Sequence, residues 1–294
     1  MLIISANSAS AIEPTQKAIM AYGRNPGDAG LNISNLVSSS GVVATDTSIA
    51  GTGRAALAAC SYGGDKAIFG YGQGLSNLTN LVSNSGVVAA DTTGVGTARS
   101  NLAAAGYGND KGIFAYGNDG SVTALSNLVS NSGVVASDVT GVGTARNDLA
   151  ACSFGDDRAI FGFGNTNISN LVSNSGVVAS DATGVGTSRG SLAACSYGGD
   201  KGIFAYGISP ATSISNLVSN TGVVASDTSG VGTARQNLGA AGYGGDKGIF
   251  AYGYIHGHVS MSNLVSNSGV VASDVTGVGT VRYLLAAAGY SFTA

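Results

Sequence analysis

The side chains with the clearest capacity for chemistry lie in one short segment. Tyr254, His256 and His258 are near neighbours there, and the two histidines are the only ones in the chain. Two imidazoles at this spacing can bind a metal ion, but a metal site needs further ligands, and no carboxylate or thiol lies close by in the sequence. We therefore expect no metal site and no other cofactor, and interpret the segment as a polar surface loop.

The charged residues are few and regularly placed. The chain has 13 basic and 16 acidic residues among its 294. All the basic residues except Arg24 recur at two repeated positions, and most acids also follow a repeat. The remaining acids are scattered: Glu13, Asp28, Asp119, Asp148 and Asp156. Because catalysis needs a local, unsymmetrical group of titratable side chains, we expect no catalytic residue and no enzyme activity.

The tyrosines and cysteines also follow the repeat. Most tyrosines occupy repeated Tyr-Gly positions, and only Tyr254 and Tyr283 fall outside them. We expect the repeated tyrosines to pack in the core or between units. Three cysteines occupy equivalent positions where other units carry alanine, so we expect buried free thiols and no disulfide: Cys60, Cys152 and Cys195.

Composition excludes several classes of partner. The formal net charge is -3, and no cluster of Lys or Arg occurs that could neutralise phosphates, so we expect no nucleic-acid partner. The first residues lack the basic start and long apolar run of a signal peptide, and no stretch is long enough to cross a membrane. We expect no membrane insertion.

One unit of roughly 46 residues is repeated six times. The motif Ser-Asn-Leu-Val-Ser fixes the alignment, and an arginine follows it at the same interval in all six units. The aligned asparagines are Asn35, Asn80, Asn127, Asn170, Asn216 and Asn263, and the arginines are Arg54, Arg99, Arg146, Arg189, Arg235 and Arg282.

Each unit reads as four short strands separated by segments rich in turn-forming residues. In the second unit strands A, B, C and D are Leu57–Tyr62, Lys66–Tyr71, Leu78–Val82 and Val87–Ala90. Four strands at this period predict an all-β fold, a six-bladed β-propeller with four antiparallel strands per blade. The rival architecture is a β-solenoid, which normally uses shorter repeats.

The two ends of the chain complement each other. The last unit stops after an A strand, Leu285–Tyr290, and the first begins with Lys17–Gly23, which matches strand B. We expect these strands to pair and close the ring, because closure removes the free sheet edges of an open array. The predicted domains are an N-terminal arm, residues 1–14, which could dock on another subunit, and the propeller, residues 15–294.

The unit resembles the repeat of kelch β-propellers, in which an arginine precedes an apolar strand A, a turn, and a strand B that ends in an aromatic residue and glycines. Arg54, Leu57–Ala59, Gly63–Asp65 and Ile68–Gly72 occupy those places. The chain departs from the family in having Tyr-Gly for the doubled glycine and no tryptophan. The repeated Asp-Lys-x-Ile-Phe and Gly-Val-Gly-Thr-Ala-Arg motifs also resemble repeat proteins of bacteriophage tail fibres and virions.

The repeated Asp after strand D and the Arg eight residues later are interpreted as structural. Asp91 and Arg99 represent the pair in the second unit. We expect the Asp to accept hydrogen bonds from turn backbone, and the Arg to tie the long D-A segment to nearby carbonyls or to that Asp. Sixfold binding of an anion or metal is the alternative.

All the length differences between units fall in the B-C loops, which share one face of the predicted disc. A rigid scaffold that presents varied loops is a common way to build a recognition surface, although drift in unconstrained loops would give the same pattern. The candidate binding residues are Arg24, Asn25, Asp28, Gln73, Asn118, Asp119, Asn165, Asn167, Tyr254, His256 and His258.

These observations predict a non-enzymatic structural or recognition propeller. The phage resemblance implies a virion component, a tail fibre or receptor-binding module, assembled in the host cytoplasm. Its expected partners are other virion proteins or a host cell-surface receptor or glycan, and homo-oligomer formation is possible. The alternatives are a cellular kelch-like protein-interaction scaffold and a glycan-binding lectin.

Overall fold

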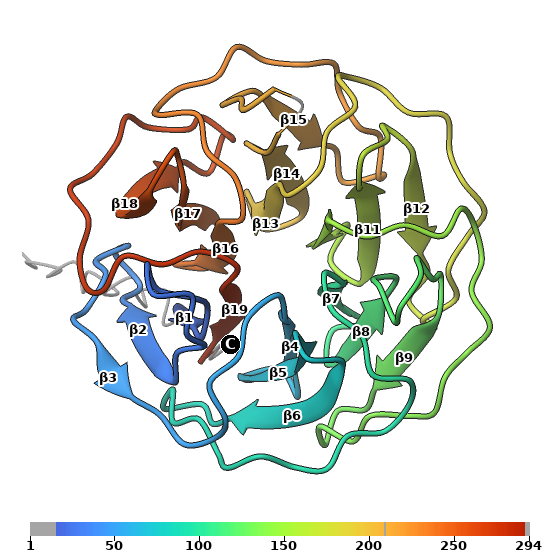
Figure 1. The fold of residues 1–294 in the computed structure, drawn as a ribbon. Helices are drawn as coiled ribbons and strands as arrows, with labels where there is room; N and C mark the ends of the chain where they lie inside the picture. The colour runs from blue at the N-terminus through green and yellow to red at the C-terminus, as the bar shows by residue number, and fades with distance from the viewer. Residues whose placement is uncertain (1–15, 209, 292–294) are drawn as a thin grey trace, which may run out of the picture.

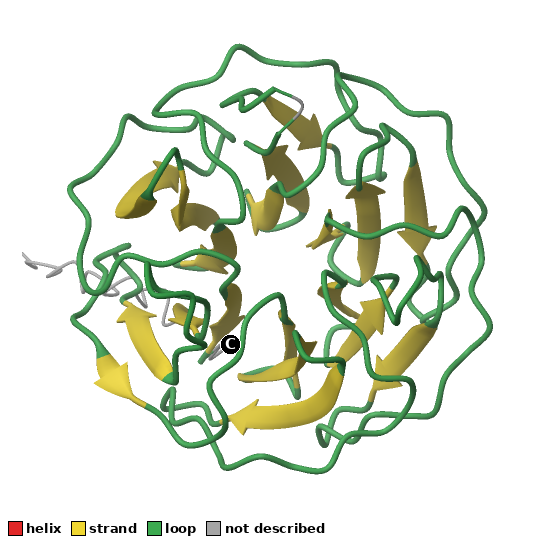
Figure 2. Ribbon diagram, viewed as in Figure 1, coloured by secondary structure: helices red, strands yellow, loops and turns green. Residues whose placement is uncertain are grey.

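The protein is all-β and consists of several small antiparallel sheets (Figures 1 and 2). The structure, a computed structural model, describes residues 16–208 and 210–291. The predicted arm at residues 1–14 lies outside these ranges. None of the described residues forms a helix that could span a membrane.

The strands found in the described ranges are short. They are β1 (Lys17–Ala21), β2 (Ile33–Val37), β3 (Thr47–Ser48), β4 (Ala58–Tyr62), β5 (Lys66–Gly72), β6 (Ser76–Val82), β7 (Ala103–Tyr107), β8 (Lys111–Ala115), β9 (Ser126–Val129), β10 (Leu149–Phe154), β11 (Arg158–Phe163), β12 (Ser169–Val172), β13 (Ala193–Tyr197), β14 (Lys201–Ala205), β15 (Ser215–Val218), β16 (Gly239–Tyr243), β17 (Lys247–Tyr254), β18 (His258–Val265) and β19 (Ala286–Tyr290).

The prediction of four strands in every sheet is wrong for most sheets. Among the described residues, five sheets have three strands, such as β4-β5-β6, and only β19-β1-β2-β3 has four. The predicted fourth strand of the second unit touches its neighbour only at isolated bridges, Val82 with Val88 and Thr79 with Thr92. Between these bridges the side chain of Asn80 donates to the Ala89 carbonyl, an acceptor that a regular ladder would have used.

The terminal strands pair as predicted. β19 runs antiparallel to β1, with Ala288 opposite Ile19, so the last strand completes the sheet that the first strand begins. In Figure 1 the six sheets lie in a ring around a common centre, and the innermost strands β19, β4, β7, β10, β13 and β16 contact one another in that cyclic order.

A circle of backbone hydrogen bonds surrounds that centre. A residue that lies one or two positions before each innermost strand takes part. Its N–H donates to the carbonyl of the equivalent residue of the preceding sheet, and the distances from N to O are 2.8–3.0 Å. We call these residues the axial ring: Ala56, Asn101, Asp148, Ser191, Asn237 and Leu284. Asn101, for example, donates to Ala56, and Ala56 in turn donates to Leu284, which completes the circle.

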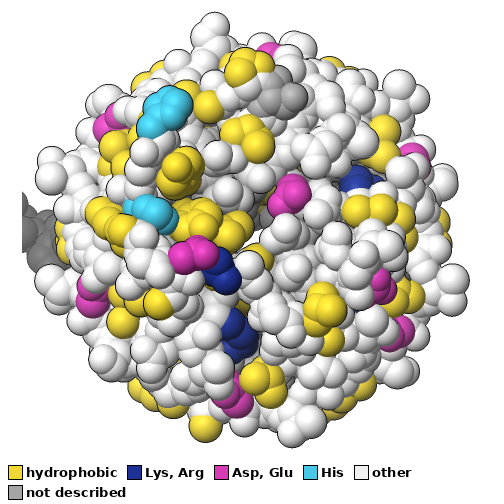
Figure 3. All heavy atoms as spheres, in the orientation of Figure 1, with side chains coloured by type: hydrophobic (Ala, Val, Ile, Leu, Met, Phe, Trp, Pro, Cys, Tyr) yellow, Lys and Arg dark blue, Asp and Glu magenta, His cyan; other side chains and the backbone are white. Residues whose placement is uncertain are grey.

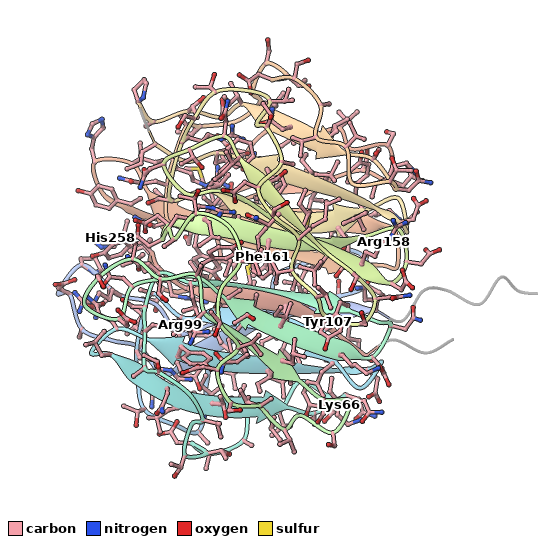
Figure 4. The ribbon with its side chains drawn as sticks, turned by 90° about the vertical axis from the view of Figure 1, so that its right-hand side faces the viewer. Lys66, Arg99, Tyr107, Arg158, Phe161 and His258 are labelled. Carbon is pink, nitrogen blue, oxygen red and sulfur yellow. The ribbon has the colours of Figure 1, made fainter. Side chains whose placement is uncertain are left out.

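The repeated arginines join neighbouring sheets. Arg99 lies over the ring of Tyr71 at 4.4 Å, while its Nε donates to the Tyr116 carbonyl and its Nη2 to Asn127 Oδ1 in the next sheet (Figure 4). This confirms that the arginine ties the connecting segment to nearby carbonyls. Five buried aromatic pairs, such as Tyr71 and Phe114, also cross between sheets edge to face.

The repeated aspartates accept hydrogen bonds from a distant turn. Asp138 accepts from the backbone N–H and the hydroxyl of Thr97, at 2.9 and 2.7 Å, although 41 residues separate them. The cysteines are buried and free, as predicted, and burial raises the pKa of the Cys60 thiol to about 12.

Candidate functional site

Several side chains that break the repeat line one pocket, which contains residues from both ends of the chain. We call it the aromatic pocket, with a cavity of about 380 Å³ lined by Asn25, Pro26, Asp28, Gln236, Asn237, Tyr254, His258 and Tyr283. In Figure 3, histidine, acidic and basic side chains gather on the face toward the viewer. Figure 4 places His258 on that face, while Lys66 and Arg158 lie toward the opposite one.

Three aromatic rings form one wall of the pocket. Tyr254 and His258 are opposite each other at the end of the β17-β18 hairpin, with ring centroids 5.5 Å apart. Tyr283, from the segment before β19, lies 4.7 Å from the His258 ring and 5.8 Å from the Tyr254 ring. The three rings therefore form one cluster from two segments of the chain.

An ion pair from the loop after β1 closes the other side. Arg24 Nη1 lies 2.6 Å from Asp28 Oδ2, and Tyr283 Oη donates to Asp28 Oδ1 at 3.1 Å. Backbone hydrogen bonds between Arg24 and Tyr283 hold this loop against the segment before β19. The Asn25 side chain accepts from two N–H groups of its own loop, which fixes the turn that presents Asp28.

These contacts set the charge states at the pocket. The hydrogen bond from Arg24 lowers the pKa of the Asp28 carboxyl, and the bond from Tyr283 adds to this. Burial raises the pKa of Tyr283, and its hydrogen bond to Asp28 acts in the same direction. Asp28 is therefore an anion paired with Arg24, and Tyr283 is a neutral phenol whose proton is held on the Asp28 side.

This arrangement suits a small polar molecule. Tyrosine rings offer flat apolar contact, while amides, a carboxylate and an imidazole fix the orientation of hydroxyl groups. Imidazole is also the side chain best suited to exchange a proton near neutral pH. The pocket therefore combines a binding wall with a proton-transfer group.

The structure brings together only some of the candidate residues. Asn25, Asp28, Tyr254 and His258 line the aromatic pocket, and Arg24, which is not a lining residue, is paired with Asp28. The lining residues do not include His256, and Gln73 lines a different cavity at the axial ring.

Two of the other four candidates bond within their own turn, and two bond to the segment that connects β12 with β13. The side chains of Asn118 and Asp119 accept N–H groups of the same turn, Asn167 donates to the Gly186 carbonyl, and the backbone of Asn165 donates to Arg189.

Sequence reasoning missed four pocket residues, Pro26, Gln236, Asn237 and Tyr283. Tyr283 carried a usable signal, because it is one of two tyrosines outside the repeated positions. The two amides carried none, since their side chains matter only once the first and last sheets become neighbours.

No model of a protein family matches the chain, and no curated protein matches it. A solved structure does match: a fungal alcohol oxidase of the AA5 family in complex with copper. The likeness covers 92% of this chain and 66% of that chain, with a TM-score of 0.58 and 11% sequence identity. The chain thus spans just under two thirds of that protein's length. At this identity the likeness shows a shared fold, and one fold can carry many functions.

This likeness corrects two predictions. The chain was expected to be a phage virion component and to lack enzyme activity, whereas the similar structure is an enzyme, and no comparison supports a phage role. The prediction from the charge pattern treated Asp28 and the histidine loop as remote from each other, although the pairing of β19 with β1 brings them to one pocket. The expected location in a phage particle, the partners and the oligomeric state stay predictions.

The aromatic pocket does not fit a copper ion. Copper(II) takes nitrogen and oxygen ligands, but the pocket offers one imidazole and one carboxylate, and the Asp28 carboxylate is already paired with Arg24. The raised pKa of Tyr283 opposes the deprotonation that ligation needs. In the part of the chain that the structure describes, no three His, Cys, Asp or Glu side chains lie together as a metal site. The chemistry of the pocket therefore rests on its own side chains.

Proposed function

We propose that this chain is a closed six-bladed β-propeller, kelch-like in its strand order, and that it is an enzyme. The cyclic contacts of the innermost strands, the β1-β19 pair and the hydrogen bond from Thr280 to Asp46 support closure. The match to an alcohol oxidase over 92% of the chain supports the fold and makes a small alcohol the first substrate class to consider.

The substrate we propose is a small hydroxyl-bearing molecule, an alcohol, polyol or sugar, bound in the aromatic pocket. One observation carries this proposal. Asp28, from near the N-terminus, shares a pocket with Tyr254, His258 and Tyr283, which lie near the C-terminus. A ring of carbons packs against the tyrosine faces, and its hydroxyls bond to the amides of Gln236 and Asn237.

The reaction class is proton abstraction from a substrate hydroxyl. The proton passes from the anomeric hydroxyl of a bound cyclic sugar to a ring nitrogen of His258, and the bond between the anomeric carbon and the ring oxygen breaks. The ring oxygen, to which the amides of Gln236 and Asn237 donate, takes the proton up, so the ring opens and can close again as the other anomer without an oxidant. Asp28 holds the phenol of Tyr283 in place, so that this ring orients the substrate against the imidazole. Tyr283 is thus a positioning residue, and His258 is the catalytic one.

The two histidines provide a matched test. His258→Gln removes the proton acceptor, so we expect kcat/KM for ring opening of the best substrate in a panel of monosaccharides to fall about 10²- to 10⁴-fold. His256→Gln changes the same loop outside the pocket, so its kcat/KM should match the wild type. Substrate loss is followed by NMR, with prior dialysis against a chelator and with or without added copper.

Three results would overturn the proposal. They are no binding or turnover of any panel member, equal losses in the two variants, and activity that appears only with copper. Thermal unfolding of both variants checks that each remains folded.

A further inference from the structure

A second cavity lies at the centre of the same face, around the axial ring. Its volume is about 350 Å³, and its lining includes the six ring residues together with Gln73, Ser100, Ile208 and Gln236. It adjoins the aromatic pocket, with which it shares Gln236 and Asn237. The cavity is many times the roughly 30 Å³ that a water molecule occupies in the liquid, so it accommodates a small molecule.

The axial ring breaks the sixfold pattern in its side chains. The backbone is the same in all six positions, with φ of 53–56°, a left-handed conformation that costs energy for residues other than glycine. The side chains instead divide the ring into two arcs. Four successive sheets contribute polar groups, Asn101, Asp148, Ser191 and Asn237, and the other two contribute Leu284 and Ala56.

The polar arc has unused hydrogen-bonding capacity. Among the described residues, none of these four side chains has a hydrogen-bond or ion-pair partner, although the backbones are all bonded in the ring. Asp148 is the only titratable residue that lines the cavity, and it is half-buried. Burial alone raises the pKa of its carboxyl. An unpaired, half-buried carboxylate costs stability, and such groups are frequent at binding sites.

An apolar channel begins beneath the ring. Its lining includes the six ring residues. The other lining residues are leucines, alanines and one glycine, in or directly before the six innermost strands, among them Leu149, Ala150 and Ala151. The site therefore has a polar mouth with one negative charge and an apolar extension along the axis of the ring.

We propose that the axial cavity binds a small aliphatic amine, with its ammonium group against Asp148 and its carbon chain in the alanine-lined channel. An ammonium group has three donors and no acceptor, which matches the carboxylate, two amide oxygens and hydroxyl of the polar arc. One carboxylate balances one positive charge, whereas calcium takes six to eight oxygen ligands, usually with several carboxylates. The apolar arc and channel accept the carbon chain, which a bare ion lacks. This site is independent of the reaction proposed at the aromatic pocket.

The test uses n-butylammonium chloride as the probe, with titration calorimetry at pH 7. We expect saturable binding to the wild type and a dissociation constant at least tenfold larger for Asp148→Asn. That variant should fold, because asparagine already occupies the same ring position at Asn101 and Asn237. Affinity should rise about fourfold for each CH₂ added between ethylammonium and butylammonium, the equivalent of ~0.8 kcal/mol per CH₂.

The controls separate charge from fold. Asp119→Asn removes an exposed carboxylate on the same face and should leave binding unchanged, and Asn101→Asp adds a second carboxylate to the ring and should tighten it.

The unliganded Asp148→Asn variant should melt at a higher temperature than wild type at pH 7 and at the same temperature near pH 3, where both side chains are neutral. Equal affinity of wild type and Asp148→Asn overturns the proposal. Binding of 1-butanol with the same affinity as n-butylammonium also overturns it. So does potassium chloride if potassium occupies the site as tightly as the amine.

Discussion

Five of the six buried arginines explain an otherwise costly backbone feature. The aromatic residue that ends the regular part of each middle strand has positive φ, for example 64° at Tyr116, which bulky residues rarely adopt. This conformation turns the Tyr116 carbonyl toward Arg99, whose Nε donates to it at 2.8 Å. Arg99 is fully buried, and burial lowers its pKa, but the carbonyl, the amide of Asn127 and the Tyr71 ring satisfy it.

The repeated aspartates predict loss of stability in acid. Burial of Asp181 opposes its ionisation, but hydrogen bonds from Thr144 and Asn170 outweigh this and lower its pKa below the ordinary value of 3.8. A carboxyl whose pKa is lowered by folding contributes stability above the unfolded value, and that contribution is lost as the pH falls through the folded value. The five equivalent aspartates show the same direction.

We therefore expect the melting temperature to fall as the pH is lowered from 5 to 2. Asp181→Asn should melt below wild type at pH 7, and the two curves should converge at the acid end. Thermal unfolding followed by circular dichroism measures this. A difference that persists unchanged at pH 2 would mean that the carboxylate charge contributes nothing at this position.

At the scale of the elements, β1 is the least regular of the middle strands. It carries Met20 where the other five carry phenylalanine, so the edge-to-face contact made by the other sheets is missing against Tyr252. Arg282, which joins the last sheet to this one, has a buried Nε without a hydrogen-bond partner in the described structure. The place where the chain ends meet is thus less well bonded than the other sheet contacts.

Filling that position should stabilise the protein. Met20→Phe supplies the missing aromatic contact, worth about 0.5–1.5 kcal/mol beyond the area it buries. Met20 packs in a cluster with Ala251. The equivalent alanines of two other sheets already pack with a phenylalanine: Ala115 with Phe161, and Ala205 with Phe250. Urea unfolding is the measurement, and Phe114→Met, the reverse change in another sheet, should destabilise. A lower free energy of unfolding for Met20→Phe would show that the site cannot accept the ring.

At the scale of the whole molecule, the proposed closure is carried by bonds between residues at opposite ends of the chain. Thr280 donates to Asp46 at 2.6 Å across 234 residues, and Thr144 makes the equivalent bond to Asp181 across 37. Closing a longer loop costs more chain entropy, but the cost grows only slowly with length. Once the ring is closed, all six such bonds should contribute alike.

A pair of variants tests this. Thr280→Val and Thr144→Val each remove one hydroxyl hydrogen bond to a partly exposed carboxylate, and we expect each to lower the free energy of unfolding by about 1 kcal/mol. Chemical unfolding measures both. If the ring were open between its first and last sheets, Thr280→Val would be nearly silent while Thr144→Val would not.

Much of the fold could be predicted from local patterns. The short strands, the turns, the buried cysteines and the pairing of the terminal strands follow from repeats of apolar and turn-forming residues, which act within a unit or between neighbours. The fourth strands could not be predicted, because whether Val88 and its neighbours form a ladder depends on where the Asn80 side chain bonds.

The sequence by itself determined that six similar units exist and which few residues depart from them, including Arg24, Asp28, Asp148 and His258. Only the tertiary structure decided which of these meet. Asp28 and Tyr283 bond across 255 residues because β19 completes the first sheet. Asp148 faces the centre because a circle of backbone hydrogen bonds fixes the axial ring. Proximity between the first and last units depends on the pairing of β19 with β1, and linear spacing carries no record of it.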